Sequence, residues 1–299
     1  MTEGTDGPPS GYLDRLAART AAVGSVLCLG LDPDPTALPP GFAPDIGGIE
    51  AFARLVLEAG VPYAAAVKPN LAFFEAFGAP GLAALERLRA GIPADVPVIA
   101  DAKRGDIGTT AARQATALFD VLGADAVTVS PYLGEEAVRP LLERDDRFAY
   151  VLCRTSNPGA GELQDLVVEP DAALGAPAEP LWARVARRAQ GWGRGATVGL
   201  VVGATAAAEL AAVRQIAPGL PLLVPGVGAQ GGEIEPVLRH GPATASPAGG
   251  RTGGGLVVNV SRGVAAAALG RAESNGPADL GERLATAART WSERLAVLG

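Results

Sequence analysis

The sequence contains very little cysteine: Cys28 and Cys153 are the only two in 299 residues. Each lies within an apolar, strand-like run, VLCLGL or YVLCRT, where a cysteine is most simply a small core residue. Two cysteines set so far apart supply neither a disulfide framework nor the closely spaced ligands of a metal site. We therefore assign them no chemistry.

Long apolar segments are also missing, since no uncharged run approaches the roughly 18 residues that a membrane-spanning helix needs. Residues 1–10 lack the basic and apolar regions of a secretion signal, so we expect a flexible polar leader and a cytoplasmic protein. The formal net charge is −7 and the arginines are scattered rather than clustered. These features argue against nucleic-acid partners and against an anionic membrane as a partner.

Lysine is nearly absent. Of 25 basic residues, only Lys68 and Lys103 are lysines, and the rest are arginines. An arginine does not readily give up a proton, whereas a lysine ammonium can, so proton-transfer chemistry points first to these two residues. Their rarity also fits a drift of composition toward arginine, so their positions must decide between the two explanations.

Short apolar or β-branched runs alternate with segments of helical period along the whole chain. The expected strands lie at 25–32, 63–70, 96–103, 125–131, 148–155, 197–203, 221–227 and 255–262. Amphipathic segments typical of helices lie between them, at 49–60, 81–91, 109–123 and 205–219. Eight strands alternating with helices favour a closed (β/α)8 TIM barrel, one α/β domain spanning 11–299, over an open doubly wound sheet.

Three segments do not fit the simple repeat. Residues 11–22 are expected to form an extra helix that closes the bottom of the barrel. Residues 163–178 exceed a normal strand-to-helix loop, and we expect them to form an excursion on the catalytic face. The tract 243–255 is rich in Gly, Ser and Pro, which predicts a mobile linker between the seventh and eighth units.

Charged residues gather where the third strand ends, which is where barrel enzymes carry their chemistry. In VIADAKRGD, the alternation of a strand directs Ile99, Asp101 and Lys103 into the barrel and Arg104 away from it. Asp106 follows on the loop. The alternative is an internal ion pair that only fills the barrel.

The neighbouring strands add to this group, because Asp32 ends the first strand and Lys68 ends the second. With Asp101 and Lys103 they form a row of alternating charge at the barrel mouth. Four charges that converge in this way favour a catalytic site over an accidental ion pair.

The last two strands end in residues suited to an anion. The segment GVGAQGG at 226–232 is a Gly-rich turn whose backbone N–H groups could cradle a phosphate, and NVSRG brings Arg262 beside it. Loops after strands seven and eight are the usual phosphate site of such barrels. A plain tight turn is the alternative for the Gly-rich segment taken alone.

Together these segments resemble the orotidine 5′-phosphate decarboxylase family, specifically its longer bacterial branch. Asp101, Lys103 and Asp106 match the family's Asp-x-Lys-x-x-Asp signature, and LGLDP, VKPN, TSNPG and GVGAQGG with the later SRG match its other landmarks in the same order. The signature alone also occurs in related sugar-phosphate decarboxylases and synthases, whereas the full set is highly specific. The resemblance covers the chain from the first strand to the eighth.

The resemblance implies a homodimer with shared active sites that converts orotidine 5′-phosphate to UMP without a metal or other cofactor. Lys103 would protonate C6 of the pyrimidine beside Asp101, which faces the departing carboxylate, while Lys68 and Asp32 would hold this network and the ribose. Three residues would reach into the neighbouring subunit's site: Asp106, Ile107 and Thr110. Ser156 would bind the pyrimidine. Gln230 would bridge the base and the phosphate, and Arg262 would bind the phosphate.

The sequence leaves three other functions as alternatives to this one. A metal-dependent sugar-phosphate decarboxylase of the same suprafamily would need a carboxylate ligand where Lys68 stands, and an ammonium there opposes a divalent cation. A Schiff-base aldolase needs a lysine of lowered pKa, whereas Asp101 and Asp106 would raise the pKa of Lys103. A non-catalytic barrel that binds a phosphorylated ligand would have no need of the intact charged row.

Overall fold

The structure is a computed structural model that describes residues 11–228, 231–269 and 277–298. Eight parallel strands form one sheet in the order β2-β1-β10-β9-β8-β5-β4-β3. Their bounds are β1 Leu27–Leu31, β2 Ala66–Pro69, β3 Ile99–Arg104, β4 Ala126–Val129, β5 Phe148–Arg154, β8 Val198–Val202, β9 Leu222–Pro225 and β10 Val257–Val260. Parallel bridges join Val67 to Val98 and Asn70 to Asp101, so the sheet closes between β2 and β3. The expected barrel is confirmed.

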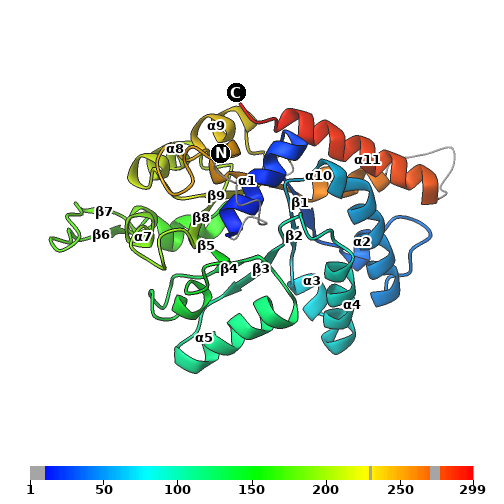
Figure 1. The fold of residues 1–299 in the computed structure, drawn as a ribbon, viewed down its shortest axis with the longest axis horizontal. Helices are drawn as coiled ribbons and strands as arrows, with labels where there is room; N and C mark the ends of the chain where they lie inside the picture. The colour runs from blue at the N-terminus through cyan, green and yellow to red at the C-terminus, as the bar shows by residue number, and fades with distance from the viewer. Residues whose placement is uncertain (1–10, 229–230, 270–276, 299) are drawn as a thin grey trace, which may run out of the picture.

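Helices surround this sheet (Figure 1). Their bounds are α1 Tyr12–Val23, α2 Ile46–Gly60, α3 Ala72–Glu75, α4 Gly78–Ala90, α5 Gly108–Ala115, α6 Gly161–Gln164, α7 Leu181–Ala189, α8 Ala207–Ile216, α9 Ile234–His240, α10 Arg262–Ala265 and α11 Pro277–Arg294. Asp45 is the N-cap of α2, because its carboxylate accepts a hydrogen bond from the Gly48 N–H at 2.9 Å. Among the described residues, no helix has both the length and the apolar character to cross a membrane.

Strands β1 and β8 are apolar throughout because they are buried on both faces, one against the barrel interior and the other against the helices. Cys28 lies inside the barrel and Cys153 packs under α7, with exposed fractions of 0% and 3%. Burial raises the pKa of each thiol to about 12, so both stay protonated at neutral pH. The prediction that they are core residues is confirmed.

Helix α1 closes the end of the barrel opposite the strand carboxyl ends, as expected for residues 11–22. Its buried side chains, Tyr12 and Leu16 among them, belong to the cluster that fills the barrel interior. The ring of Tyr12 stacks on Phe148 with centroids 4.7 Å apart, and its hydroxyl lies 3.1 Å from the hydroxyl of Tyr150. One amphipathic helix therefore supplies the bottom layer of the barrel core.

The tract 243–255 is not a mobile linker, and that prediction was wrong. It packs under the barrel, where Ala248 is fully buried and the Thr244 N–H donates to the Pro218 carbonyl at 2.9 Å. Arg251 donates to the Asp14 carboxylate on α1 at 2.8 Å. Its glycines serve tight, close-packed turns here rather than freedom of the chain.

The expected excursion at 163–178 takes the form of a hairpin arm. Its antiparallel strands are β6 (Val167–Val168) and β7 (Glu179–Pro180). The arm follows α6, leaves from the loop after β5, and projects outward beside α7 (Figure 1). It therefore originates on the face of the barrel where the strands end.

Candidate active site

Two adjoining cavities open at the carboxyl ends of the barrel strands, with volumes of about 260 and 180 Å³. They share Lys68, Asp101 and Pro225. The first is otherwise lined by Lys103, Thr128, Leu152, Thr155, Ser156, Asn157, Val201 and Leu223. The second is otherwise lined by Asp32, Gly226, Val227, Asn259, Ser261, Arg262 and Gly263. An ion-paired row thus lies between a cavity with a partly apolar wall and a more polar one.

Asp101 is the centre of this row. Its Oδ2 accepts from Nζ of Lys68 at 2.6 Å, and its Oδ1 accepts from Nζ of Lys103 at 2.6 Å. The Lys68 side chain is almost fully buried, whereas that of Lys103 is 52% exposed. One carboxylate therefore joins a buried ammonium to an ammonium that faces the cavity.

The charges of the row stabilise one another. Burial alone would raise the pKa of Asp101, but the Lys68 and Lys103 ammonium groups outweigh it and hold the pKa well below its ordinary value. Burial alone would lower the pKa of Lys68, but Asp101 and Asp32 outweigh it and raise the pKa. Both groups therefore remain charged through the neutral range.

Lys103 reaches Asp101 from an unusual backbone. Its φ is +47°, a left-handed conformation that costs a side-chain-bearing residue on the order of 1 kcal/mol. The pairing of β3 with β4 also shifts register between Ala100 and Arg104, so the regular alternation expected along β3 does not hold at Lys103. The side chain still faces the cavity, while Arg104 pairs with Glu75.

Thr128 on β4 supports this backbone, a role that was not predicted from the sequence. Its Oγ1 accepts from the N–H groups of Ala102 and Lys103 at 3.1 and 3.0 Å and donates to Asp101 Oδ1 at 2.9 Å. One hydroxyl thereby fixes both the strained turn and the central carboxylate. The only signal in the sequence was a polar side chain within the apolar run DAVTVSP.

The second cavity holds polar groups that lack partners. Oδ1 of Asp32 is buried and has no hydrogen-bond partner within the described part of the chain. Arg262 begins α10 at the cavity wall, and its guanidinium makes no hydrogen bond or ion pair with a described residue. A carboxylate and a guanidinium in the lining of one cavity suit a ligand that carries both hydroxyl groups and an anion.

The turn after β9 borders the same cavity. Gly226, Gly228 and Gly231 all have positive φ, between 76° and 94°, which favours glycine. The turn is closed by a hydrogen bond from the Gly232 N–H to the Gly226 carbonyl at 3.2 Å. Gln230 lies outside the described residues, so its predicted role stays a prediction.

Asp106, Ile107 and Thr110 line neither cavity. The Asp106 carboxylate accepts from the Ile107 N–H at 2.8 Å, and the Ile107 side chain is 61% exposed. Thr110 lies on the exposed first turn of α5. The structure therefore brings Asp32, Lys68, Asp101 and Lys103 around shared cavities, but it does not bring these three residues to them.

Ser156 stands on the wall of the first cavity, on the loop after β5. Thr155 and Asn157 line the same wall, and the sequence analysis did not single out either one. The loop packs tightly on the next barrel strand, because a Cβ at Gly203 would lie 2.7 Å from Cβ of Ser156. Glycine at 203 is therefore required for this close approach.

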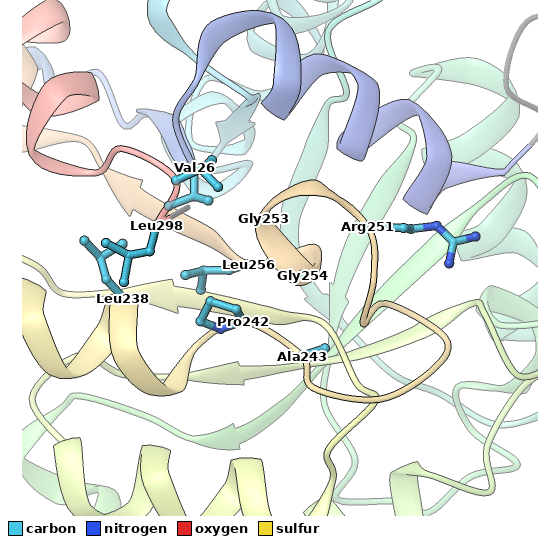
Figure 2. Close-up of a pocket in the computed structure, with 10 residues that line it drawn as sticks. Val26, Leu238, Pro242, Ala243, Arg251, Gly253, Gly254, Leu256 and Leu298 are labelled. Atoms are coloured by element: carbon cyan, nitrogen blue, oxygen red, sulfur yellow. The ribbon is translucent and has the colours of Figure 1, made fainter.

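A separate cavity of about 210 Å³ lies at the opposite end of the barrel (Figure 2). Apolar side chains such as Val26, Leu238 and Leu256 line it, and Arg251 is the one charged residue in its described lining. Arg251 is already paired with Asp14, so this cavity carries no catalytic constellation. In the described ranges, no group of three or more His, Cys, Asp or Glu residues is placed to hold a metal ion.

Comparison with known proteins gives consistent matches. The Orotidine 5′-phosphate decarboxylase / HUMPS family matches residues 25–275. The orotidine 5′-phosphate decarboxylase of Thermomicrobium roseum is 48% identical over 85% of this chain and 86% of its own, and that of Roseiflexus castenholzii is 46% identical over 91% and 90%. The solved OMP decarboxylase of Leishmania donovani is 37% identical, with a TM-score of 0.74 over 95% of this chain and 99% of that one.

Proposed function

The chain belongs to the orotidine 5′-phosphate decarboxylase / HUMPS family, and we propose that it converts orotidine 5′-phosphate to UMP and carbon dioxide in de novo pyrimidine biosynthesis. The two adjoining cavities form its active site. The observation that carries the proposal is the Asp101 carboxylate held between Lys68 and Lys103 at the mouth of the barrel.

The substrate would lie across both cavities. Its phosphate would occupy the second cavity near Arg262, with Gln230 reaching it and the base from the Gly-rich turn. The ribose hydroxyls would meet Asp32, whose buried Oδ1 has no partner among the described residues. The pyrimidine would then occupy the first cavity, with Ser156 on one side and Lys103 on the other.

The chemistry follows from this placement. When the bond from C6 to the carboxyl carbon breaks, its electron pair stays on C6 as a carbanion in the ring plane, which the π system cannot delocalise. The Lys103 ammonium would stabilise that charge by roughly 4 kcal/mol at about 4 Å and an effective dielectric near 20, and would then donate its proton to C6. Asp101 beside the substrate carboxylate would raise the energy of the ground state.

These charge effects are too small to account for a barrier reduction of the order of 20 kcal/mol, which the most proficient enzymes approach. Binding energy from remote groups can supply part of the difference when it is realised in the transition state. Arg262 and Gln230 at the phosphate end are the groups we assign to this task.

We propose that the reaction needs no metal or other cofactor. The supporting observation is the buried Lys68 ammonium beside Asp101, which opposes a divalent cation at the same carboxylate. A metal-dependent sugar-phosphate decarboxylase of the same suprafamily would need a carboxylate ligand at that position.

We also propose a cytoplasmic homodimer in which each active site is built by two chains. Asp106, Ile107 and Thr110 lie outside their own chain's cavities, where a twofold partner could receive them. Exposed apolar side chains continue this surface on the loop after β4, where Tyr132 is 81% and Leu133 is 53% exposed.

The decisive assay follows the loss of orotidine 5′-phosphate absorbance with purified protein in the presence of EDTA, with chromatographic identification of UMP. Turnover that persists in EDTA supports the proposal. Activity that disappears in EDTA and returns with magnesium would favour the metal-dependent alternative, and complete inactivity would favour the non-catalytic barrel.

A further inference from the structure

The loop after β5 is held by a side chain that lines neither cavity. Gln164 ends the short helix α6, and its carboxamide contacts Thr155 twice. Oε1 accepts from the Thr155 N–H at 2.9 Å, and Nε2 donates to Thr155 Oγ1 at 2.8 Å. A contact that uses both ends of one planar amide fixes the position and the orientation of its partner.

The contact extends across Ser156. Having accepted from Gln164, the Thr155 hydroxyl donates to Oδ1 of Asn157 at 2.6 Å. Ser156 thus stands between two residues that belong to one hydrogen-bonded chain starting at Gln164. All three loop residues line the first cavity, where the pyrimidine is proposed to bind.

Gln164 is itself supported by its surroundings. Arg154, at the end of β5, approaches Gln164 Oε1 at 3.4 Å and pairs with Asp165 at 3.3 Å. The backbone closes the base of the hairpin arm through a bond from the Leu181 N–H to the Leu166 carbonyl at 2.8 Å. The amide therefore projects from an anchored segment.

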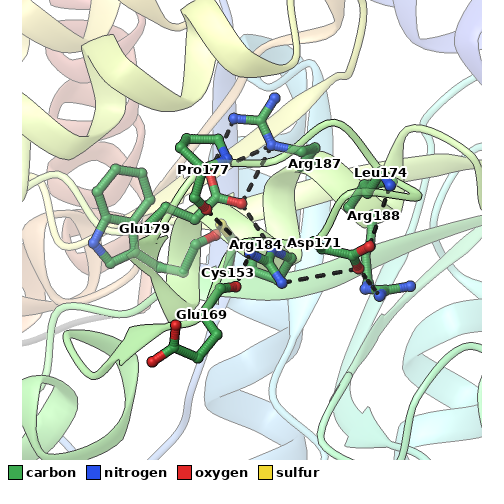
Figure 3. A network of polar contacts seen from close by, with 10 residues as sticks. Cys153, Glu169, Asp171, Leu174, Pro177, Glu179, Arg184, Arg187 and Arg188 are labelled. Carbon is green, nitrogen blue, oxygen red and sulfur yellow. Dashed lines mark hydrogen bonds and ion pairs between the residues drawn. The ribbon is translucent and has the colours of Figure 1, made fainter.

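The arm beyond it is fastened to α7 by ion pairs (Figure 3). Glu179 is buried and accepts from Arg184 at 2.8 Å and from Arg187 at 2.9 Å. Asp171 near the arm's turn pairs with Arg188 at 2.6 Å. This network ties the arm that follows α6 to the outer helix layer.

We infer that Gln164 is a positioning residue that holds the loop from Thr155 to Asn157 against the pyrimidine end of the active site. The inference rests on the proposed function for the identity of the ligand. It also assigns a role to the arm, whose root carries Gln164. Because the phosphate end lies in the other cavity, loss of Gln164 should weaken recognition of the base and leave recognition of the phosphate intact.

The test compares Gln164→Leu with Gln190→Leu, a matched change at an exposed glutamine after α7. Dissociation constants for UMP and for ribose 5-phosphate are measured by calorimetry on the full chain. For Gln164→Leu we expect UMP binding to weaken by about tenfold and ribose 5-phosphate binding to change by less than about twofold. The control should change neither.

Hydrogen exchange gives a second measurement that does not depend on a ligand. The Thr155 amide donates to Gln164 in the folded protein, so it should exchange faster in Gln164→Leu, while the melting temperature should stay close to that of the wild type. The double variant Thr155→Val, Gln164→Leu should bind UMP more tightly than the product of the two single-variant fold-changes predicts. The reason is that both substitutions remove the same interaction.

Equal weakening of UMP and ribose 5-phosphate binding would overturn the inference, and so would unchanged exchange at Thr155. Failure of the proposed function gives a different result. If the wild-type protein binds both compounds but does not decarboxylate orotidine 5′-phosphate, the enzyme assignment is wrong. The two dissociation constants would still test whether Gln164 positions the loop.

Discussion

The buried ammonium of Lys68 lies 2.6 Å from the carboxylate of Asp101, and the two side chains are only 5% and 12% exposed, so each charge depends on the other for stabilisation. Removing one member of a buried pair typically costs about 3–5 kcal/mol because the other is left uncompensated. The pair therefore couples the catalytic row to the stability of the barrel.

Lys68→Met should lower the free energy of unfolding by about 3 kcal/mol at neutral pH, measured by urea denaturation. The folded-state pKa of Asp101 is depressed, so its contribution to wild-type stability is present above the unfolded pKa of about 4 and is lost as the pH falls below it. In the variant, burial favours protonation of Asp101. The difference in the free energy of unfolding between the wild type and Lys68→Met should therefore become smaller as the pH falls toward 4.

Arg239→Met serves as the control, because Arg239 pairs with Glu235 on the exposed surface of α9. Its effect on the free energy of unfolding should be small and should vary little with pH. A Lys68→Met protein as stable as this control would show that the buried pair does not stabilise the fold.

Lys103→Ala should reduce turnover of orotidine 5′-phosphate by at least about a thousandfold, because it removes both the proton donor and the charge nearest the reacting carbon. Binding of UMP should change little, since product needs no proton from this residue. Steady-state assays and calorimetry separate the two effects. Turnover within about tenfold of wild type would remove Lys103 from the chemical step.

Arg262→Ala should weaken catalysis of the phosphorylated substrate by several kcal/mol and barely alter the slow reaction of the nucleoside that lacks the phosphate. The expected difference arises because the guanidinium has no described partner in the free protein and stands ready for an anion. The measurement is kcat/KM for both substrates. An equal loss of kcat/KM for the nucleotide and for the nucleoside would mean that Arg262 does not bind the phosphate.

Mixing inactive variants tests the proposed homodimer with shared active sites. Lys103→Ala and Asp106→Ala homodimers should each be severely impaired, but co-refolding them gives mixed dimers in which one site carries both native residues. With random pairing, half of the dimers are mixed and about a quarter of all sites recover. A mixture that stays inactive after verified subunit exchange would mean that Asp106 serves its own chain.

The barrel could be predicted because strands buried on both faces appear in the sequence as unbroken apolar runs between helical segments. The same logic missed Thr128, because one threonine in such a run is also an ordinary strand residue. The left-handed turn at Lys103 could not be predicted either, since it depends on a register shift between two strands. Simple alternation nevertheless predicted that Lys103 lies beside Asp101, although the backbone that brings them together is not a regular strand.

The tract 243–255 shows a different limit. Gly, Ser and Pro occur both in mobile turns and in closely packed ones, so its composition does not distinguish the two. Only the surrounding structure shows which kind of turn forms. Gly219, for example, has no room for a Cβ because the Ser246 carbonyl oxygen would lie 1.9 Å from it. For the same reason, the contacts of the 163–178 arm with α7 could not be predicted from its irregular sequence.

The ion pair between Asp14 and Arg251 joins residues 237 positions apart, and the backbone next to β1 bonds to Leu295 near the other end of the chain. During synthesis α1 leaves the ribosome long before Phe148 and Tyr150, which pack on its Tyr12. The barrel cannot close until β10 has been made, because β10 pairs with both β1 and β9. The apolar face of α1 therefore waits for partners that are distant in the sequence, and contacts of this kind slow folding.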